Sequence, residues 1–490
     1  MSVLGNVGRA MAAVLVLSAA ACDVGPDYVR PSAPVPANYK EMAGWQPARP
    51  SDAIDRGAWW SVFNDPVLDG LERQIDVGNQ NLRATEAAYR EARALVAEAR
   101  AGLYPTLSGS SNIQRQRTAG ASGAGLTTSS GSLSGQVSWE IDLWGKVRRQ
   151  VESNVAAAQS SAADLASVRL SAQAELATDY FELRLQDSLQ RLYDETVAAY
   201  ERTLRIIRNQ YAAGVAAQLD VVTAQTQVET TRATAVAIAL QRAKYEHAIA
   251  LLIGKPPAEL SIDRGTLAQQ VPGAPASLPS TLLERRPDIA QAERQMQAQN
   301  ALIGVQIAAF YPTLDLTVTL GTVGSPFSPL ATVWSLAAAG GQVIFDGGAR
   351  TAATAAAHAS YDQSVASYRQ AVLAAFQDIE DELASVAVLG RQHQAQLVAE
   401  QLARRAADIA LNEYLAGTQN YTAVVTAQAT AFTAQAATLQ TQAGRLEAAV
   451  SLIRALGGGW DSTQLPDMTE LRSHPLRNPD KDVARMPSAG

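Results

Sequence analysis

The sequence of 490 residues contains a single cysteine, Cys22, and four histidines. One cysteine excludes an intrachain disulfide. The histidines stand far apart with no i,i+4 pair, so they do not predict a metal site. There is no Walker or dinucleotide-binding loop and no G-x-S-x-G order of a nucleophile elbow. We therefore expect no cofactor, no metal, no catalytic residues and no enzymatic activity.

Charge and long apolar runs are also scarce. Charged residues make up 18% of the chain, aromatic residues 6%, and the net charge is −7. Without a basic footprint, nucleic acid is not expected as a partner. Beyond residue 21 no segment reaches the roughly 18 to 20 apolar residues of a spanning helix. If the chain crosses a membrane, it must therefore use strands.

The first 21 residues are typical of a secretory signal. Arg9 precedes an apolar run that ends at Leu17, and small residues lead up to Cys22. A lone cysteine at this junction resembles a bacterial lipoprotein signal, whose thiol is acylated and becomes the mature N-terminus. We predict lipidation at Cys22, followed by an extended strap over 22–60, because its prolines forbid regular helix.

One stretch of the sequence occurs twice. Tyr211 to Gln225 reads YAAGVAAQLDVVTAQ, and Tyr414 to Gln428 reads YLAGTQNYTAVVTAQ. The copies lie about 200 residues apart, which is far more than a solenoid unit, so each copy belongs to a half-molecule. A glycine after a long periodic segment, with a second segment soon after it, predicts the turn of a helical hairpin. We therefore predict two equivalent hairpin tips.

The segments around the first tip predict very long helices. Lys146 to Ala213 contains no proline, and a continuous helix over it would be roughly 100 Å long. From Val221 to Leu252, mostly apolar residues recur at alternating spacings of three and four positions. This spacing predicts an antiparallel, left-handed coiled coil. Shorter helices are expected from Pro66 to about Ala101 and from Pro287 to about Ala308, where proline takes the first helical position.

Between these helices the period changes from helical to alternating. Trp139 and Ile141 alternate with polar residues in the first half, and Leu316 and Val318 do so in the second. This pattern predicts strands with one apolar face and one wet face, the latter carrying residues such as Glu140.

These patterns divide the chain into segments. They are a signal peptide at 1–21, the lipid-anchored strap at 22–60, a first repeat at 61–258, a linker at 259–283, a second repeat at 284–460 and a polar tail at 461–490 that is expected to be disordered.

Six short segments of the sequence together carry a family resemblance. CDVGPDYVRP, WWSVFNDPVLDGL, LLERRPDIAQAE, AAFYPTL, VIFDGGAR and ALGGGW, in this order, resemble the outer-membrane factor family of the TolC type. Within it they resemble the NodT/OprM-like lipoprotein branch, which serves RND efflux systems. The resemblance implies a mainly α homotrimer, in which each chain gives four strands to a shared membrane β-barrel and two helical hairpins to a periplasmic α-barrel. Four strands cannot close a barrel alone, which independently argues for sharing.

The resemblance also implies a function and a location. The chain would be the outer-membrane channel of a tripartite RND efflux system, embedded in outer-membrane lipid and exporting substrates from the periplasm to the exterior. Its partners would be a periplasmic adaptor, or membrane fusion protein, and an inner-membrane RND pump. A periplasmic adaptor would lack the alternating strands, and a helical scaffold lipoprotein would need neither them nor duplicated tips. The cargo is not encoded in any motif that we recognise.

The resemblance places two sets of site residues. The adaptor-docking tips are Ala213, Gly214, Val215, Ala416, Gly417 and Thr418. The periplasmic gate is assigned to Asp220, Tyr414 and Gln419. Many relatives carry acidic residues where this sequence has Ala423 and Thr426, so we expect neutral hydrogen bonds more than salt bridges to hold the entrance closed.

A run of carboxylates was also considered as a site. Asp378, Glu380, Asp381 and Glu382 are near neighbours in the sequence. Consecutive carboxylates on a helix point in different directions, so a solvated or tunnel-facing stripe is the expectation here.

Overall fold

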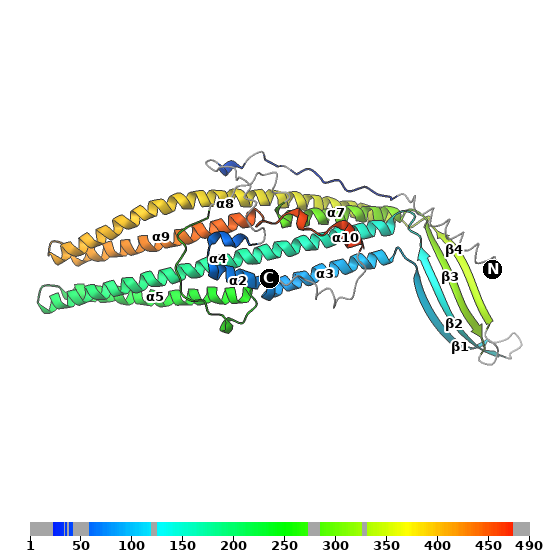
Figure 1. The fold of residues 1–490 in the computed structure, drawn as a ribbon, viewed down its shortest axis with the longest axis horizontal. Helices are drawn as coiled ribbons and strands as arrows, with labels where there is room; N and C mark the ends of the chain where they lie inside the picture. Colours follow the sequence, from blue (N-terminus) through cyan, green and yellow to red (C-terminus); the bar gives the residue numbers. More distant parts are fainter. Residues whose placement is uncertain are drawn as a thin grey trace.

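The computed structural model describes residues 23–33, 35–36, 39–42, 58–118, 125–272, 285–325 and 331–473. The predicted signal peptide and Cys22 lie outside these residues. The chain is long and narrow, with a helical bundle at one end and a curved sheet at the other (Figure 1). The change in the sequence from a helical to an alternating hydrophobic period therefore marks the boundary between the helical bundle and the sheet.

Two long helical hairpins form the bundle. The first pairs α4 (Lys146–Ala212) with α5 (Gln218–Leu252), and the second pairs α8 (Ala349–Leu415) with α9 (Tyr421–Ala455). The long helices both have 67 residues and the return helices both have 35. Both tips lie at the end of the bundle farthest from the sheet (Figure 1).

No helix in the described part of the chain is both long enough and apolar enough to cross a membrane.

Shorter helices extend each return helix along its long partner. These are α2 (Pro66–Gly78), α3 (Gln80–Ala101) and α7 (Pro287–Ala308). The Asn79 amide donates to the carbonyl oxygen of Leu252 at 2.9 Å, so α3 begins where α5 ends. Likewise, the Arg286 guanidinium donates to the Ala455 carbonyl at 3.1 Å, which joins the start of α7 to the end of α9.

The first of these joints corrects the predicted single helix from Pro66 to Ala101. Asn79 ends α2 and caps α3, because its side chain accepts from the backbone N–H of Leu82 at 3.0 Å. Gly254 lies directly against this break with a φ of +71°, and a Cβ there would lie 1.9 Å from the Gly78 carbonyl oxygen. The end-to-end stacking therefore requires glycine at position 254.

The sheet has four antiparallel strands in the order β1-β2-β3-β4. Their bounds are Thr106–Thr118, Leu126–Glu140, Thr313–Gly324 and Ala331–Gly341. Strand β4 ends at the Gly340-Gly341 pair. The pairing of β2 with β3 joins the two repeats into one sheet, with Val137 opposite Val318.

The N-terminal strap follows the outside of α7 and α8. Tyr39 is buried against Phe376 of α8, and the Arg30 guanidinium pairs with Glu293 of α7 at 3.1 Å. The backbone N–H groups of Lys40 and Glu41 donate to the Glu380 carboxylate at 2.6 and 3.0 Å. Glu380 therefore holds the strap, which corrects its assignment to a solvated or tunnel-facing stripe.

The predicted disordered tail is ordered over its first part. Residues Met468–Ser473 form α10, and Asp467 caps it by accepting from the Thr469 N–H at 2.9 Å. Leu471 is buried against Val96 of α3 and Val151 of α4. The segment 461–473 thus belongs to the folded body, while residues 474–490 lie outside the described part.

Glu72 is a carboxyl group with no exposed surface and no hydrogen-bond partner in the described structure. Burial, followed by the charges of Asp76 and Asp69, raises its pKa to about 9. Because this folded-state pKa lies above the unfolded value of 4.5, folding takes up a proton, and stability falls as pH rises from about 4.5 to 9.

Replacing Glu72 with methionine, which is apolar and similar in length, should remove this loss. We expect Glu72→Met to stabilise the protein at pH 8 by up to about 5 kcal/mol and to flatten the pH dependence of its thermal unfolding. The exposed Glu91 of α3 supplies the control, Glu91→Met. Identical unfolding temperatures for wild type and Glu72→Met at pH 5 and pH 8 would contradict an unpaired buried acid.

Candidate functional site

The two hairpin tips have the same backbone geometry. In the first, the N–H of Gly214 donates to Tyr211 and that of Val215 to Gln210, both at 2.9 Å. In the second, Gly417 donates to Tyr414 at 2.9 Å and Thr418 to Glu413 at 3.0 Å. The glycines have φ values of +76° and +74°, where residues with a Cβ are strained. The duplicated Tyr-x-Ala-Gly thus encodes a helix stop of the Schellman type twice.

Both tips present small and apolar groups to solvent. All six predicted docking residues are exposed, and a Cβ added at Gly214 or Gly417 would meet no atom within 4 Å. Val215 is 77% exposed and Leu219 is 73% exposed. Exposed apolar side chains that gather at one end of a molecule are characteristic of a protein-interaction surface.

Behind the tips, the two hairpins of one chain contact each other through an apolar cluster with a polar rim. Leu204 and Val228 of the first hairpin pack with Tyr421 and Val424 of the second. The Tyr421 hydroxyl donates to the Gln227 side-chain oxygen at 3.3 Å. The ring of Tyr414 lies 5.4 Å from that of Tyr421.

Of the three predicted gate residues, Tyr414 packs at this contact. Burial raises the pKa of the Tyr414 hydroxyl, and the negative charge of the Asp220 carboxylate adds to the effect. Gln419 lies in the tip loop with an exposed side chain that makes no hydrogen bond to the described residues. The structure therefore places Tyr414 at the contact between the hairpins, within the electrostatic influence of Asp220, and leaves Gln419 outside this contact.

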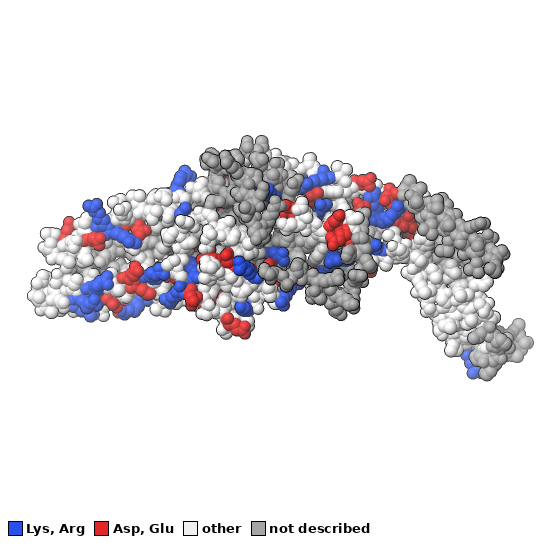
Figure 2. Space-filling view, viewed as in Figure 1, with Lys and Arg blue, Asp and Glu red and all other residues white. Residues whose placement is uncertain are grey.

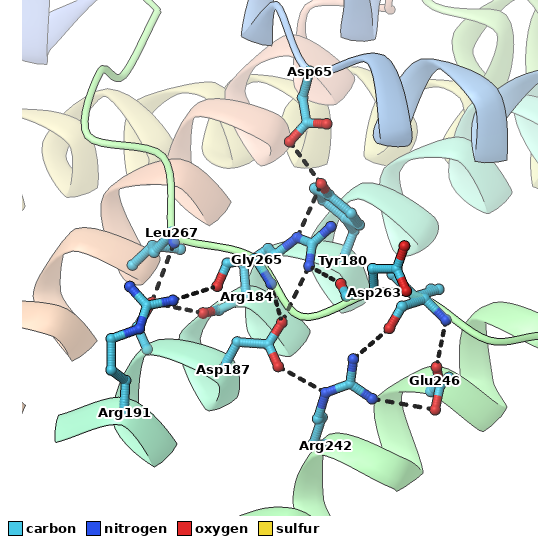
Figure 3. A network of polar contacts seen from close by, with 12 residues as sticks. Asp65, Tyr180, Arg184, Asp187, Arg191, Arg242, Glu246, Asp263, Gly265 and Leu267 are labelled. Carbon is cyan, nitrogen blue, oxygen red and sulfur yellow. Dashed lines mark hydrogen bonds and ion pairs between the residues drawn. The ribbon is translucent and has the colours of Figure 1, made fainter. Parts of the chain in front are cut away.

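A network of buried charges, which the sequence did not reveal, fixes the linker between the repeats to the first hairpin (Figure 3). Asp187 accepts from Arg242 at 2.7 Å and from Arg184 at 3.1 Å. The two guanidiniums in turn donate to the linker carbonyls of Ile262 and Asp263 at 2.6 and 2.7 Å. The linker is thus held by hydrogen bonds to its backbone, together with the buried side chains of Ile262 and Leu267.

The network continues to the start of α2. The Tyr180 hydroxyl accepts from Arg184 at 3.0 Å and donates to Asp65 at 2.6 Å. Asp65 also caps α2 by accepting from the Val67 N–H at 2.9 Å. One buried chain of hydrogen bonds therefore links α2, α4, α5 and the linker near the middle of the molecule (Figure 3).

A small cavity of about 170 Å³ lies where α7 and α9 meet α4 and α8. Three charged residues of its lining are already paired, because Arg286 contacts Asp288 at 2.7 Å and Asp378 at 3.1 Å. Asp378 therefore stabilises the joint at Arg286 and does not belong to a free carboxylate stripe. Within the described residues, no group of three or more potential ligands could hold a metal ion.

The sheet has one apolar and one polar face over most of its length. Directly opposed residues share a face, and Trp139 stands opposite Leu316, while Ser138 stands opposite Thr317. Ile141 departs from the predicted apolar face, because it lies beyond the end of β2 and is 5% exposed. The two outer strands, β1 and β4, each lack a second neighbour among the described residues.

Comparison with known proteins gives this arrangement a family. The description "outer membrane efflux protein" applies to a family that matches residues 72–255 and 278–458, one segment in each repeat. The chain belongs to the outer membrane efflux protein family. The two matched segments correspond to the two hairpins with their strands, which is the duplication seen in the sequence.

Relatives and solved structures agree over nearly the whole length. This outer membrane efflux protein is 31% identical to the probable efflux pump outer membrane protein TtgC of Pseudomonas putida, over 90% of the chain and 93% of the relative. It is 32% identical to the outer membrane protein OprJ of Pseudomonas aeruginosa, over 92% and 95%. The solved OprN channel superposes with a TM-score of 0.83 at 29% identity, covering 90% of this chain and all of that one. The protein is therefore an outer-membrane channel component of an efflux system.

Proposed function

We propose that three copies of the chain form one continuous tunnel through the outer membrane and the periplasm, as part of a tripartite RND-type efflux system. The observation that carries the proposal is the sheet, which has one apolar face and two open edges on a chain with matched helical hairpins. Unpaired edges are not tolerated in lipid, and single-chain barrels begin at about eight strands, so four strands per chain need partners. A helical scaffold or a periplasmic adaptor would have no use for such a sheet.

In this proposal the repeats 61–258 and 284–460 each supply one hairpin and two strands, joined by the linker 259–283. The polar faces of the strands and helices line the path for the exported molecule. The described residues offer neutral Ser, Thr and Gln side chains there, which accept varied cargo, so the inner-membrane pump selects what is exported. The chain itself acts as a conduit without enzymatic activity.

We further propose lipid anchoring at Cys22. The support is the position of the first described residues, because Asp23 pairs with Arg148 at 3.0 Å and the Val24 N–H donates to Trp144 at 3.2 Å. Both partners lie at the junction of sheet and helices, the level of the membrane surface, where an acyl chain can enter lipid. An unmodified N-terminal peptide in the mass spectrum of the mature protein would disprove the anchor.

We propose that the tips close the tunnel at its periplasmic end through Asp220, Tyr414 and Gln419. Tyr414 packs where the two hairpins of a chain meet, the Asp220 charge acts on it, and the exposed Gln419 can bond to a neighbouring protomer. In planar bilayers we expect small wild-type conductance with weak dependence on ionic strength, since screening acts mainly on charges. Asp220→Ala, Tyr414→Phe and Gln419→Ala should each raise it severalfold.

Two measurements test the channel and the gate as separate proposals. Purified wild-type protein should migrate as a heat-modifiable trimer and insert into bilayers, and a monomer without conductance would refute the channel itself. Thr430→Ala, on α9 away from the tip contact, is the control variant. Conductance of all three gate variants at the wild-type level would remove these residues from the gate while leaving the trimer intact.

Docking of the periplasmic adaptor is assigned to the two tips, Ala213 to Val215 and Ala416 to Thr418. Gly417→Glu puts a charge on this surface without a clash, since nothing lies within 4 Å. It should abolish efflux in cells and leave conductance in bilayers unchanged. Gly417→Ala controls for the strain of a Cβ at positive φ, about 1 to 2 kcal/mol, and should retain efflux. Normal efflux from Gly417→Glu would exclude this tip from docking.

A further inference from the structure

The charges on the four strands are few and are sorted to opposite ends of the sheet. The strands carry only Arg115 and Arg117 near the far end of β1, and Glu140 and Asp315 near the helices. In the sequence, no acidic residue occurs between Leu103 and Trp139 or between Leu316 and Phe345. Neither the strands nor the loops that join them can therefore neutralise the two arginines, which lie exposed at the distal end of the sheet (Figure 2).

The two arginines lie on the apolar face of the sheet. Residues on alternate positions of a strand share a face, so Arg115 and Arg117 follow Leu107 and Ile113, which are 78% and 83% exposed. The intervening Gln114 and Gln116 lie on the polar face, where the amide of Gln114 donates to Gln116 at 3.1 Å. A basic pair thus extends the outward, lipid-facing stripe and does not face the pore.

The height of the pair on the sheet decides what it meets. We take the level of Trp139, near the helix end of the sheet, as the lower edge of the apolar band. Thr106 of β1 stands opposite Ser138 of β2, so this level lies about ten residues before Arg115 along β1. At about 3.3 Å per residue and a tilt of 35–45°, this is roughly 25 Å along the membrane normal, which is the usual height of the apolar band. The guanidinium groups therefore lie just above the hydrocarbon, at the outer headgroup level.

We propose that Arg115 and Arg117 bind the phosphate groups of the glycolipid in the outer leaflet of the outer membrane. The inference rests on the proposed membrane orientation of the sheet. Guanidinium forms bidentate, charge-assisted hydrogen bonds with phosphate, and neither the strands nor the loops that join them supply an anion at this level. In the trimer, β1 would pair with β4 of the next chain, and β4 has no charged residue that could compete.

The test uses the full-length trimer in detergent and lipid A carrying both phosphates as the probe. Native mass spectrometry and a fluorescence titration measure binding to wild type and to Arg115→Gln/Arg117→Gln. A second variant adds Gln114→Arg and Gln116→Arg, which restores both charges at the same height on the polar face. We expect at least tenfold weaker binding by the double variant, no recovery in the swapped variant, and similar weakening for wild type with dephosphorylated lipid A.

Other results overturn the inference. They are equal binding by wild type and double variant, recovery in the swapped variant, indifference to the lipid phosphates, or equally tight binding of inorganic phosphate, which would make the free anion the ligand. Trimer migration and bilayer conductance of each variant are recorded alongside. A conducting trimer that ignores lipid A refutes only the lipid site, whereas a wild type without trimer or conductance refutes the proposed channel.

Discussion

Replacing Asp187 with alanine is expected to destabilise the protein by about 3 to 5 kcal/mol. The Asp187 side chain is 1% exposed and is paired with Arg184 and Arg242, which are 7% and 15% exposed. Removing the carboxylate leaves the Arg184 guanidinium in the interior without its counter-charge, and leaves Arg242 with Glu246, at 3.3 Å, as its carboxylate partner. The effect should be much larger than the 0 to 1 kcal/mol of a surface ion pair.

The same variant should release the linker, because Asp187 also accepts from the N–H of Gly265 at 3.0 Å. Trypsin should then cleave faster after the exposed Arg264. The matched control is Asp194→Ala on the same helix, where the carboxylate is exposed and bonded only to Gln190 among the described residues. Equal thermal stability and equal cleavage at Arg264 in the Asp187 and Asp194 variants would refute the role of the network.

The second large effect is expected in the sheet. Leu320 is 60% exposed on the apolar face between Gly135 and Trp334, at a height near the middle of the apolar band. Arginine at this depth on the lipid face should cost about 2 to 4 kcal/mol. Thr319 precedes it on the polar face, between Gln136 and Ser335, so Thr319→Arg should be tolerated.

The measurement is folding into lipid vesicles, followed by urea titration of the gel shift between heated and unheated samples. Leu320→Arg should fold with a lower urea midpoint or a reduced yield of trimer, while Thr319→Arg should match wild type. If arginine is tolerated equally at both positions, the assignment of the two faces is wrong.

The long-range features of the fold could be predicted because they repeat. The duplicated Tyr-x-Ala-Gly marked both tips, and the seam from Val221 to Leu252 gave the period of the coiled coil. Proline at 66 and 287 located helix starts, since proline has no N–H to lose at the first helical position. The break at Asn79 was not predicted, because the apolar pattern continues through it. Gly78 and Asn79 nevertheless form a helix C-terminus followed by the N-cap of the next helix.

The contacts that fix the middle of the molecule could not be predicted in the same way. Asp187, Arg242 and the Ile262 carbonyl are distant in sequence, and the carbonyl has no side-chain signal at all. Glu380 and Asp378 looked like a solvated stripe because their partners, the strap and Arg286, come from other parts of the chain. The gate residues Asp220, Tyr414 and Gln419 stay a prediction, because the contacts that would close the tunnel lie between chains.

The equal lengths of the two hairpins have a consequence for symmetry. With 67 and 35 residues in each pair of helices, both turns end at the same distance from the sheet. Three chains would then present six turns in one plane, arranged with approximate six-fold and strict three-fold symmetry. A ring of six identical subunits could match this end, but its members would alternate between AlaGlyVal and AlaGlyThr contacts. Two classes of binding environment are therefore built into an assembly of otherwise identical parts.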